Sequence, residues 1–116
     1  MKEFLFIFRV DYSKMQQLPP QELQNVAESA KNWIESVAAQ NKLADKGNRL
    51  VPNSGKVLKS KTLVTDGPYV ETKEAINGYL IIKTDTPEAA VELAKGNPIF
   101  TFNIGGSIEV RAISTI

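Results

Sequence analysis

The segment from Glu3 to Val10 constrains the fold more than any other stretch of the chain, because it is apolar at nearly every position. In an extended strand, successive side chains point to opposite faces of the sheet. Two apolar sets result, one formed by Phe4, Phe6, Phe8 and Val10 and the other by Leu5 and Ile7. A strand that is apolar on both faces is covered on both faces. The segment therefore predicts a strand inside a sheet that has a cover on each side.

Two segments carry the signals of amphipathic helices. The first begins at Pro19-Pro20-Gln21-Glu22, where proline in the first turn loses no hydrogen bond, and ends near Asn41. Its apolar residues recur at three- and four-residue steps and are Leu23, Val26, Ala27, Ala30, Trp33, Ile34, Val37 and Ala38. The second begins at Thr86-Pro87-Glu88, with a hydroxyl cap, and stops at Gly96. We expect Trp33 and the phenylalanine row to form the core rather than a cofactor site.

Three further segments show strand-like patterns. The β-branched run from Gly78 to Thr84 is the best candidate for a second central strand. Val57–Thr65 and Ser107–Ile113 are the other two. The intervening segment Leu43–Ser60 is rich in Gly, Asn, Pro and Ser, and predicts loop and turns around a short strand at residues 49–51.

The predicted order of elements is β, α, β, β, α, β in a single domain over residues 1–116. This is the order of the ferredoxin-like α+β fold, an antiparallel sheet with two helices on one face. The other face, which we call the helix-free face, still needs a cover. We expect a second copy of the chain there, so that a homodimer forms sheet to sheet over Leu5 and Ile7, or over their Phe neighbours if the two faces are reversed. The alternative cover is the segment Leu43–Ser60, folded over that face.

The chain of 116 residues contains neither cysteine nor histidine. Disulfides, thiolate nucleophiles and the usual Ser-His or Cys-His pairs are excluded, which leaves carboxylates, Lys and Tyr for acid–base chemistry. We expect no metal and no cofactor. The net charge of +1 and the scattered lysines predict no binding to nucleic acid or to a membrane surface. No apolar run is long enough for a signal peptide or a membrane span, which predicts a cytoplasmic protein.

The stretch Thr65–Glu74 is the least ordinary part of the sequence. Asp66-Gly67 favours a tight hairpin turn, but Pro68 cannot donate to a strand ladder and holds Gly67 extended. We therefore predict a broader, stiff loop. Within it, Asp66 either hydrogen-bonds its own backbone to fix the turn or offers its charge to a ligand.

A set of motifs accompanies this stretch: Val64–Tyr69, Glu71, Lys73-Glu74, Gly78-Tyr79, Pro87–Ala90, Pro98 and Gly105–Arg111, with Trp33 in the first helix. The set resembles the YCII-related family, and within it the DGPF-domain branch, over nearly the whole chain. The resemblance implies a ferredoxin-like fold that dimerises as an α+β barrel, and genes that lie beside those of alternative sigma factors. Some related proteins pair a histidine with an aspartate in a proposed active site, which this chain cannot do because it has no histidine. Tyr69 replaces the phenylalanine of the branch's name.

Charged and polar residues around this loop and the last strand form a candidate site, consisting of Asp66, Glu71, Lys73, Glu74, Tyr79, Glu109 and Arg111. If they converge at a cleft between sheet and helices, they would bind a small polar or anionic ligand, with Lys73 or Arg111 on the anionic group. The alternative is that they pair for stability. Glu109 and Arg111 lie two residues apart on one strand face, which suits an ion pair equally well.

Three functions remain open from the sequence. The first is a dimeric small-ligand-binding or regulatory module without cofactor, which the resemblance links to sigma-factor regulation. The second is a cofactor-independent enzyme acting on a small polar molecule, in which Asp66 or Glu71 is the base and Lys73 or Arg111 stabilises negative charge. The third is an assembly partner for another protein. Whether the chain is an enzyme is not decided by its sequence.

Overall fold

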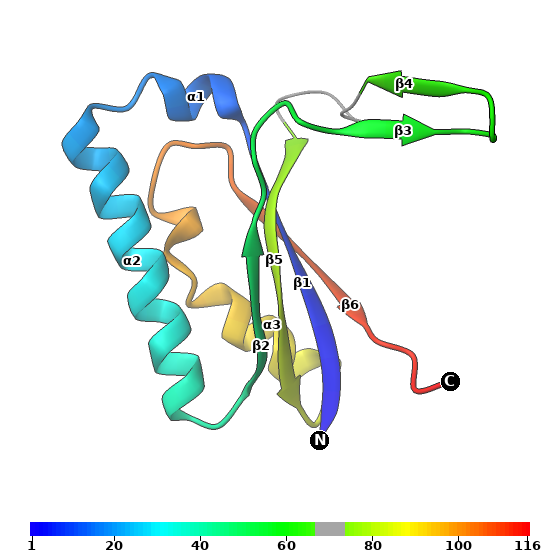
Figure 1. Cartoon of the computed structure of the whole chain (residues 1–116). Helices are drawn as coiled ribbons and strands as arrows, with labels where there is room; N and C mark the ends of the chain where they lie inside the picture. The colour runs from blue at the N-terminus through cyan, green and yellow to red at the C-terminus, as the bar shows by residue number, and fades with distance from the viewer. Residues whose placement is uncertain (67–73) are drawn as a thin grey trace.

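A four-stranded antiparallel sheet forms the centre of the computed structural model, which describes residues 1–66 and 74–116 (Figure 1). The strands in spatial order are β2 (Leu43–Arg49), β5 (Ala75–Thr84), β1 (Lys2–Val10) and β6 (Ser107–Ala112). Every neighbouring pair is antiparallel. The predicted central positions of β1 and β5 are confirmed, and the architecture agrees with the predicted ferredoxin-like α+β class.

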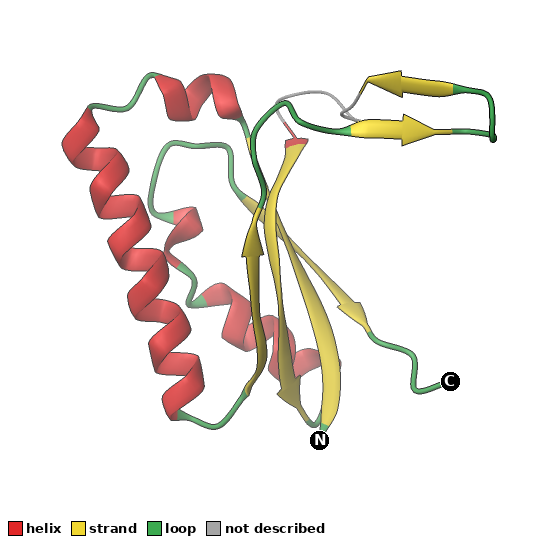
Figure 2. Cartoon of the chain, in the orientation of Figure 1, coloured by secondary structure: helices red, strands yellow, loops and turns green. Residues whose placement is uncertain are grey.

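Helices α2 (Pro20–Ala39) and α3 (Pro87–Lys95) cover one face of this sheet (Figure 2). Helix α3 begins as predicted, because the hydroxyl of Thr86 accepts a hydrogen bond from the backbone nitrogen of Ala89 at 3.1 Å. Both predicted helices are therefore confirmed, and they lie on the same side of the sheet.

Two shorter elements were not predicted. Helix α1 (Tyr12–Gln16) follows β1 and is capped by Asp11, whose carboxylate accepts a hydrogen bond from the backbone nitrogen of Ser13 at 3.0 Å. A single 3₁₀ turn, η2 (Pro98–Phe100), follows α3. Among the helices of the described residues, none combines the length and the apolarity needed to cross a membrane.

The main core lies between the sheet and its two covering helices. Phe6 is 0% exposed and stacks on Trp33, with ring centroids 6.3 Å apart. Phe4 pairs with Ile82 and Phe6 with Leu80 across β1 and β5, so that these side chains share the helix-covered face. The predicted core role of Phe4, Phe6 and Trp33 is confirmed.

The helix-free face carries the alternate residues of the same strands. Leu5 lies opposite Ile81 and Ile7 opposite Tyr79. These four side chains are half-buried within the sheet, and no described helix covers them (Figure 2). Leu5 and Ile7 therefore lie on the helix-free face, as predicted.

The prediction for Leu43–Ser60 is wrong in its first part, because Leu43–Arg49 forms the edge strand β2 rather than a loop. Strand β2 contains Asp45, Gly47 and Asn48, residue types that are depleted in strands. Its pairing with β5 is irregular around Asp45, whose carboxylate accepts a hydrogen bond from the backbone nitrogen of Gly47 at 2.7 Å. Pairing with β5 thus overrides a weak local preference.

The strand predicted at Val57–Thr65 does not belong to the four-stranded sheet. This segment instead supplies parts of a separate two-stranded hairpin, formed by β3 (Lys56–Leu58) and β4 (Val64–Asp66). We call residues 50–66 the arm. The arm projects from one end of the sheet, on the side opposite α2 (Figure 1). It does not lie flat on the helix-free face, so Leu43–Ser60 does not provide the alternative cover.

Candidate functional site

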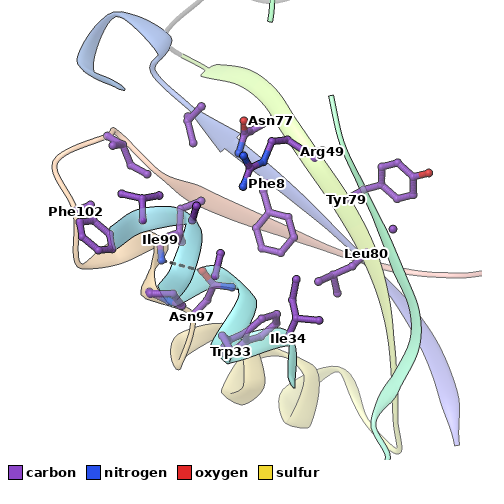
Figure 3. A pocket seen from close by; sticks show the side chains of 18 of the residues that line it. Phe8, Trp33, Ile34, Arg49, Asn77, Tyr79, Leu80, Asn97, Ile99 and Phe102 are labelled. Atoms are coloured by element: carbon purple, nitrogen blue, oxygen red, sulfur yellow. Dashed lines mark hydrogen bonds between the residues drawn. The ribbon is translucent and has the colours of Figure 1, made fainter. Parts of the chain in front are cut away.

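A cavity of about 370 Å³ lies between α2 and the sheet (Figure 3). Its walls are mostly apolar and include Phe8, Val10, Met15, Leu23, Val26, Ala27, Ala30, Trp33, Ile34, Leu80, Ile99, Phe102 and Ile104. Sites for small organic molecules have volumes of about 300–1,000 Å³. The cavity is therefore large enough for such a molecule.

Small residues on both walls create this cavity. Gly78 of β5 lies opposite Phe8 of β1, in the row of residues that faces the helices. Ala27 and Ala30 line the cavity from α2. Because neither the glycine nor the alanines reach far from their backbones, the space between the two layers stays open.

Helix α2 also packs on the sheet along only part of its length. Its buried residues, Trp33 and Val37, belong to its second half, whereas Leu23 in its first half is 37% exposed. An amphipathic helix normally buries its apolar stripe throughout. The first half of α2 therefore leaves room that the cavity occupies.

Arg49 and Asn77 lie at one end of the cavity, which we call the mouth (Figure 3). Arg49 is exposed there and forms no ion pair with a carboxylate in residues 1–66 or 74–116. Nearby, the Tyr12 hydroxyl donates a hydrogen bond to the carbonyl oxygen of Ile76 at 3.5 Å. Burial raises the pKa of Tyr12, and the positive charge of Arg49 opposes that rise. A cationic group is thus available at the mouth.

Asn97 supplies a second polar group to the cavity wall, away from the mouth (Figure 3). This side chain is 8% exposed, and its oxygen accepts a hydrogen bond from the backbone nitrogen of Ile99 at 2.8 Å. Its Nδ2 group donates to no other side chain or backbone group in the described part of the chain. The amide is therefore free to donate to a bound molecule.

None of Arg49, Asn77 or Asn97 is among the predicted site residues. The cavity that gives them a shared role forms between segments that are far apart in the sequence. One signal was present, since Gly78 interrupts an apolar strand and a glycine inside a strand often marks a place where a ligand approaches.

Three charged side chains form a cluster on the helix-free face, which we call the arginine cluster. Glu109 accepts hydrogen bonds from Arg9 at 3.1 Å and from Arg111 at 3.2 Å. These bonds, that from Arg9 above all, hold the pKa of Glu109 below its usual value. The alternative prediction that Glu109 and Arg111 pair with each other is confirmed, and Arg9 joins them from the neighbouring strand.

The arginine cluster does not lie between the sheet and the helices, where the candidate site was expected. Strand β6 places Glu109 opposite Ile7 and Arg111 opposite Leu5, so both face the helix-free side. The ring of Tyr79 also points away from the cavity (Figure 3), and its hydroxyl accepts a hydrogen bond from Asn48 at 3.1 Å. The expected position is corrected for these three residues, because strand alternation directs them to the other face.

Two of the remaining predicted residues are described, Asp66 at the end of the arm and Glu74 directly before β5. Asp66 ends β4 and forms an ion pair with Lys56 across the hairpin. The backbone carbonyl of Glu74 accepts a hydrogen bond from Arg9 at 3.4 Å. Glu71 and Lys73 lie outside the described residues. A ligand-binding role for the predicted set therefore stays a prediction.

The chain matches the family model of the YCII-related domain over residues 6–116. It belongs to the YCII-related family. The matched span contains the cavity walls, the arginine cluster and the arm, so all three are parts of this YCII-related domain. The predicted family is confirmed. No curated protein matches the chain.

Proposed function

We propose that this YCII-related domain binds a small molecule with an apolar body and an anionic group in the cavity between α2 and the sheet. The observation that carries the proposal is the position of Arg49, which has no described carboxylate partner at the mouth of a mostly apolar cavity. An anionic group at the mouth would form a charge-assisted hydrogen bond with Arg49. The apolar body would gain about 25 cal/mol for each Å² that the walls remove from water.

Two amides add selectivity to this arrangement. Asn77 lies at the mouth beside Arg49, and the Nδ2 group of Asn97 is free to donate deeper in the cavity. A ligand that lacks a matching acceptor would leave a buried donor without a partner, which costs binding free energy. The cavity therefore favours molecules with a second polar atom over simple hydrocarbons.

The described lining supports binding more than acid–base catalysis. No Asp or Glu lines the cavity in residues 1–66 or 74–116. Asp66, a predicted base, pairs with Lys56 on the arm. The proposed role is a ligand-binding or regulatory module, and action without cofactor is part of the same proposal. A cytoplasmic place in sigma-factor regulation, which the resemblance to the DGPF branch implies, belongs to the same proposal.

The proposal includes a homodimer formed through the helix-free face. Its support is the row of half-buried apolar residues on that face, namely Leu5, Ile7, Tyr79 and Ile81. A second copy docked sheet to sheet would cover this row, since the same apolar face is self-complementary about a two-fold axis. Glu109 and Arg111 of the arginine cluster lie on the outer strand β6, and Arg9 lies near the end of β1, so the cluster would sit toward the rim, where charged groups keep contact with water.

Thermal melting with a matched pair of probes tests the ligand proposal. The probes are 4-phenylbutyrate and its neutral alcohol, 4-phenylbutanol, with the parent chain, Arg49→Gln and Arg111→Gln. At 100 times the Kd, a ligand adds about 2.7 kcal/mol to the free energy of unfolding. We expect the carboxylate to raise the melting temperature of the parent and of Arg111→Gln, but not that of Arg49→Gln. The alcohol should act weakly on all three proteins.

Two results would contradict the proposal. If no aryl or alkyl carboxylate shifts the melting of the parent chain, the cavity is not an anion-selective site. If Arg111→Gln loses the shift and Arg49→Gln keeps it, the ligand binds at the residue predicted from the sequence, on the helix-free face.

A further inference from the structure

The arm leaves more apolar side chain in water than a stable surface hairpin should. Of the residues in β3 and β4, only Val57 is half-buried, and the others are exposed. The large exposed apolar side chains of the arm are Val51 at 72%, Leu58 at 67%, Val64 at 53%, Leu63 at 48% and Leu50 at 40%. An isolated two-stranded hairpin is marginally stable in water. The arm therefore needs a surface on which to pack.

The arm is nevertheless a defined structure rather than an irregular loop. Leu58 lies opposite Val64, and Lys56 opposite Asp66, with an ion pair between the latter two. At the turn, the backbone nitrogen of Leu63 donates to the Ser60 hydroxyl at 3.1 Å. Side chains two residues apart on a strand share a face, so the Leu58–Val64 pair and the Lys56–Asp66 pair lie together. The hairpin thus presents one ordered face, which is apolar toward its tip and charged at its base.

The direction of the arm identifies the side on which its partner lies. In Figure 1 the arm leaves the end of the sheet on the side opposite α2, which is the side of the helix-free face. The Cα atoms span 43 × 42 × 18 Å with a radius of gyration of 15.3 Å. A compact chain of this length has a radius of gyration of about 13 Å. The arm therefore extends well beyond the body, on the side of the helix-free face.

The helix-free face alone is small for a stable interface. Four strands of 6 to 10 residues, spaced about 4.8 Å apart, form a flat area of about 500 Å². Specific interfaces bury about 800 Å² on each partner. A second copy on this face would lie within reach of the arm, whose apolar side chains supply the additional area.

We infer that the arm packs against the body of a second copy of this chain, with Leu58 and Val64 as its apolar contacts. We call this contact between the arm and the second copy the clasp. The inference rests on the homodimer in the proposed function, and adds to it the residues that hold the two copies together. Because the dimer is symmetric, each copy provides one arm and receives the other. Burial of both arms would also explain why neither arm packs on its own body.

Photo-crosslinking tests the clasp, since the chain has no cysteine and a single introduced thiol can be labelled at one place. Leu58→Cys carries a benzophenone maleimide on the arm, and Val91→Cys, at a position that is 41% exposed on α3, carries the same label as a control. We expect irradiation to join two chains covalently from the arm position and not from the control. Mass spectrometry of the joined peptides should then map the contact to the partner's body.

A second measurement uses dimer dissociation constants from sedimentation equilibrium. The double variant Leu58→Ser with Val64→Ser should weaken the dimer at least tenfold and keep the far-ultraviolet circular dichroism of the parent, whereas Val91→Ser should change neither. Crosslinks confined to one chain, or an unchanged dissociation constant, would overturn the clasp while leaving a dimer through the helix-free face intact. A parent chain that is monomeric at 100 µM would remove both.

Discussion

The two faces of the central sheet are built from alternate residues of the same strands, yet they lie in different environments. On the helix-covered face Phe6 and Ile82 are 0% exposed, and the cavity with Arg49 at its mouth lies on the same face. On the helix-free face their neighbours Ile7 and Ile81 stay half-buried, and Ile7 lies opposite Glu109 of the arginine cluster. One alternating pattern thus serves internal packing on one side. On the other side it leaves a face that we assign to a second copy.

Ile82→Ala and Ile81→Ala compare the two faces at adjacent positions with the same chemistry. Ile82→Ala should lower the free energy of unfolding by about 4 kcal/mol, because the substitution removes a fully buried side chain and leaves a cavity. Ile81→Ala should cost about 1 kcal/mol in the monomer, because Ile81 is only half-buried there. Urea unfolding measures both.

The dependence of these two losses of stability on protein concentration tests whether a second copy covers Ile81. If a second copy covers Ile81, the loss from Ile81→Ala should grow as the protein concentration rises, while the loss from Ile82→Ala stays constant. Equal losses for the two variants at every concentration would mean that the two faces do not differ.

Gly47→Ala tests the edge strand β2, which belongs to both faces of the sheet. Gly47 has φ +65°, and a Cβ atom there would lie 1.7 Å from the carbonyl oxygen of Tyr79. The left-handed backbone and the overlap together should cost about 3 kcal/mol, because β2 must move away from β5. Urea unfolding reports the loss of stability, and melting with 4-phenylbutyrate reports the loss of the cavity wall.

Gly96→Ala is the matched control for this substitution. A Cβ atom at Gly96 would lie 3.6 Å from the nearest atom, the carbonyl oxygen of Leu93, and the backbone there is not left-handed. The control should change the free energy of unfolding by about 0.5 kcal/mol or less. A similar small effect from Gly47→Ala would show that β2 is not held against β5.

Glu109→Gln makes the smallest change, which is confined to the helix-free face. The folded state lowers the pKa of Glu109 below its usual value of 4.5, so its stabilising effect is present above that value and is lost as pH falls through the folded pKa. The melting temperatures of parent and variant should therefore differ near neutral pH and converge in acid. Glu35→Gln, an exposed residue on α2, is the control and should run parallel to the parent. A pH-independent difference for Glu109→Gln would contradict the role of the arginine cluster.

Most of the fold was predictable because its elements carry local patterns. The alternation in β1, the stripe of α2 and the cap at Thr86 each determine an element from neighbouring residues. Strand β2 was not predictable in this way, since its sequence disfavours strands and its pairing depends on β5. The arm was misassigned because Val57–Thr65 has a strand pattern, and a pattern does not say to which sheet a strand belongs.

The site was predictable only where it follows from strand register. Glu109 and Arg111 share a face because they are two residues apart, and the structure confirms that contact. Arg9 joins Glu109 from the neighbouring strand, and Arg49 reaches the mouth at the end of the edge strand β2, whose first six residues no local signal revealed. Contacts of this kind depend on how distant segments pack together in the folded chain. No pattern among neighbouring residues reveals them.

The central claim is that the helix-free face is the docking face of the domain, and sedimentation equilibrium of Ile7→Asp beside the parent chain tests it most directly. Ile7 lies at the middle of that face, between Tyr79 and Glu109 on the neighbouring strands. A carboxylate there would lose its contact with water in the dimer but would keep it in the monomer. We expect the parent to have an apparent mass twice its chain mass of 12.8 kDa, and the variant to have an apparent mass of 12.8 kDa. The variant should keep the circular dichroism and the 4-phenylbutyrate binding of the parent. A parent that sediments at 12.8 kDa, or a variant that remains dimeric, would contradict the account.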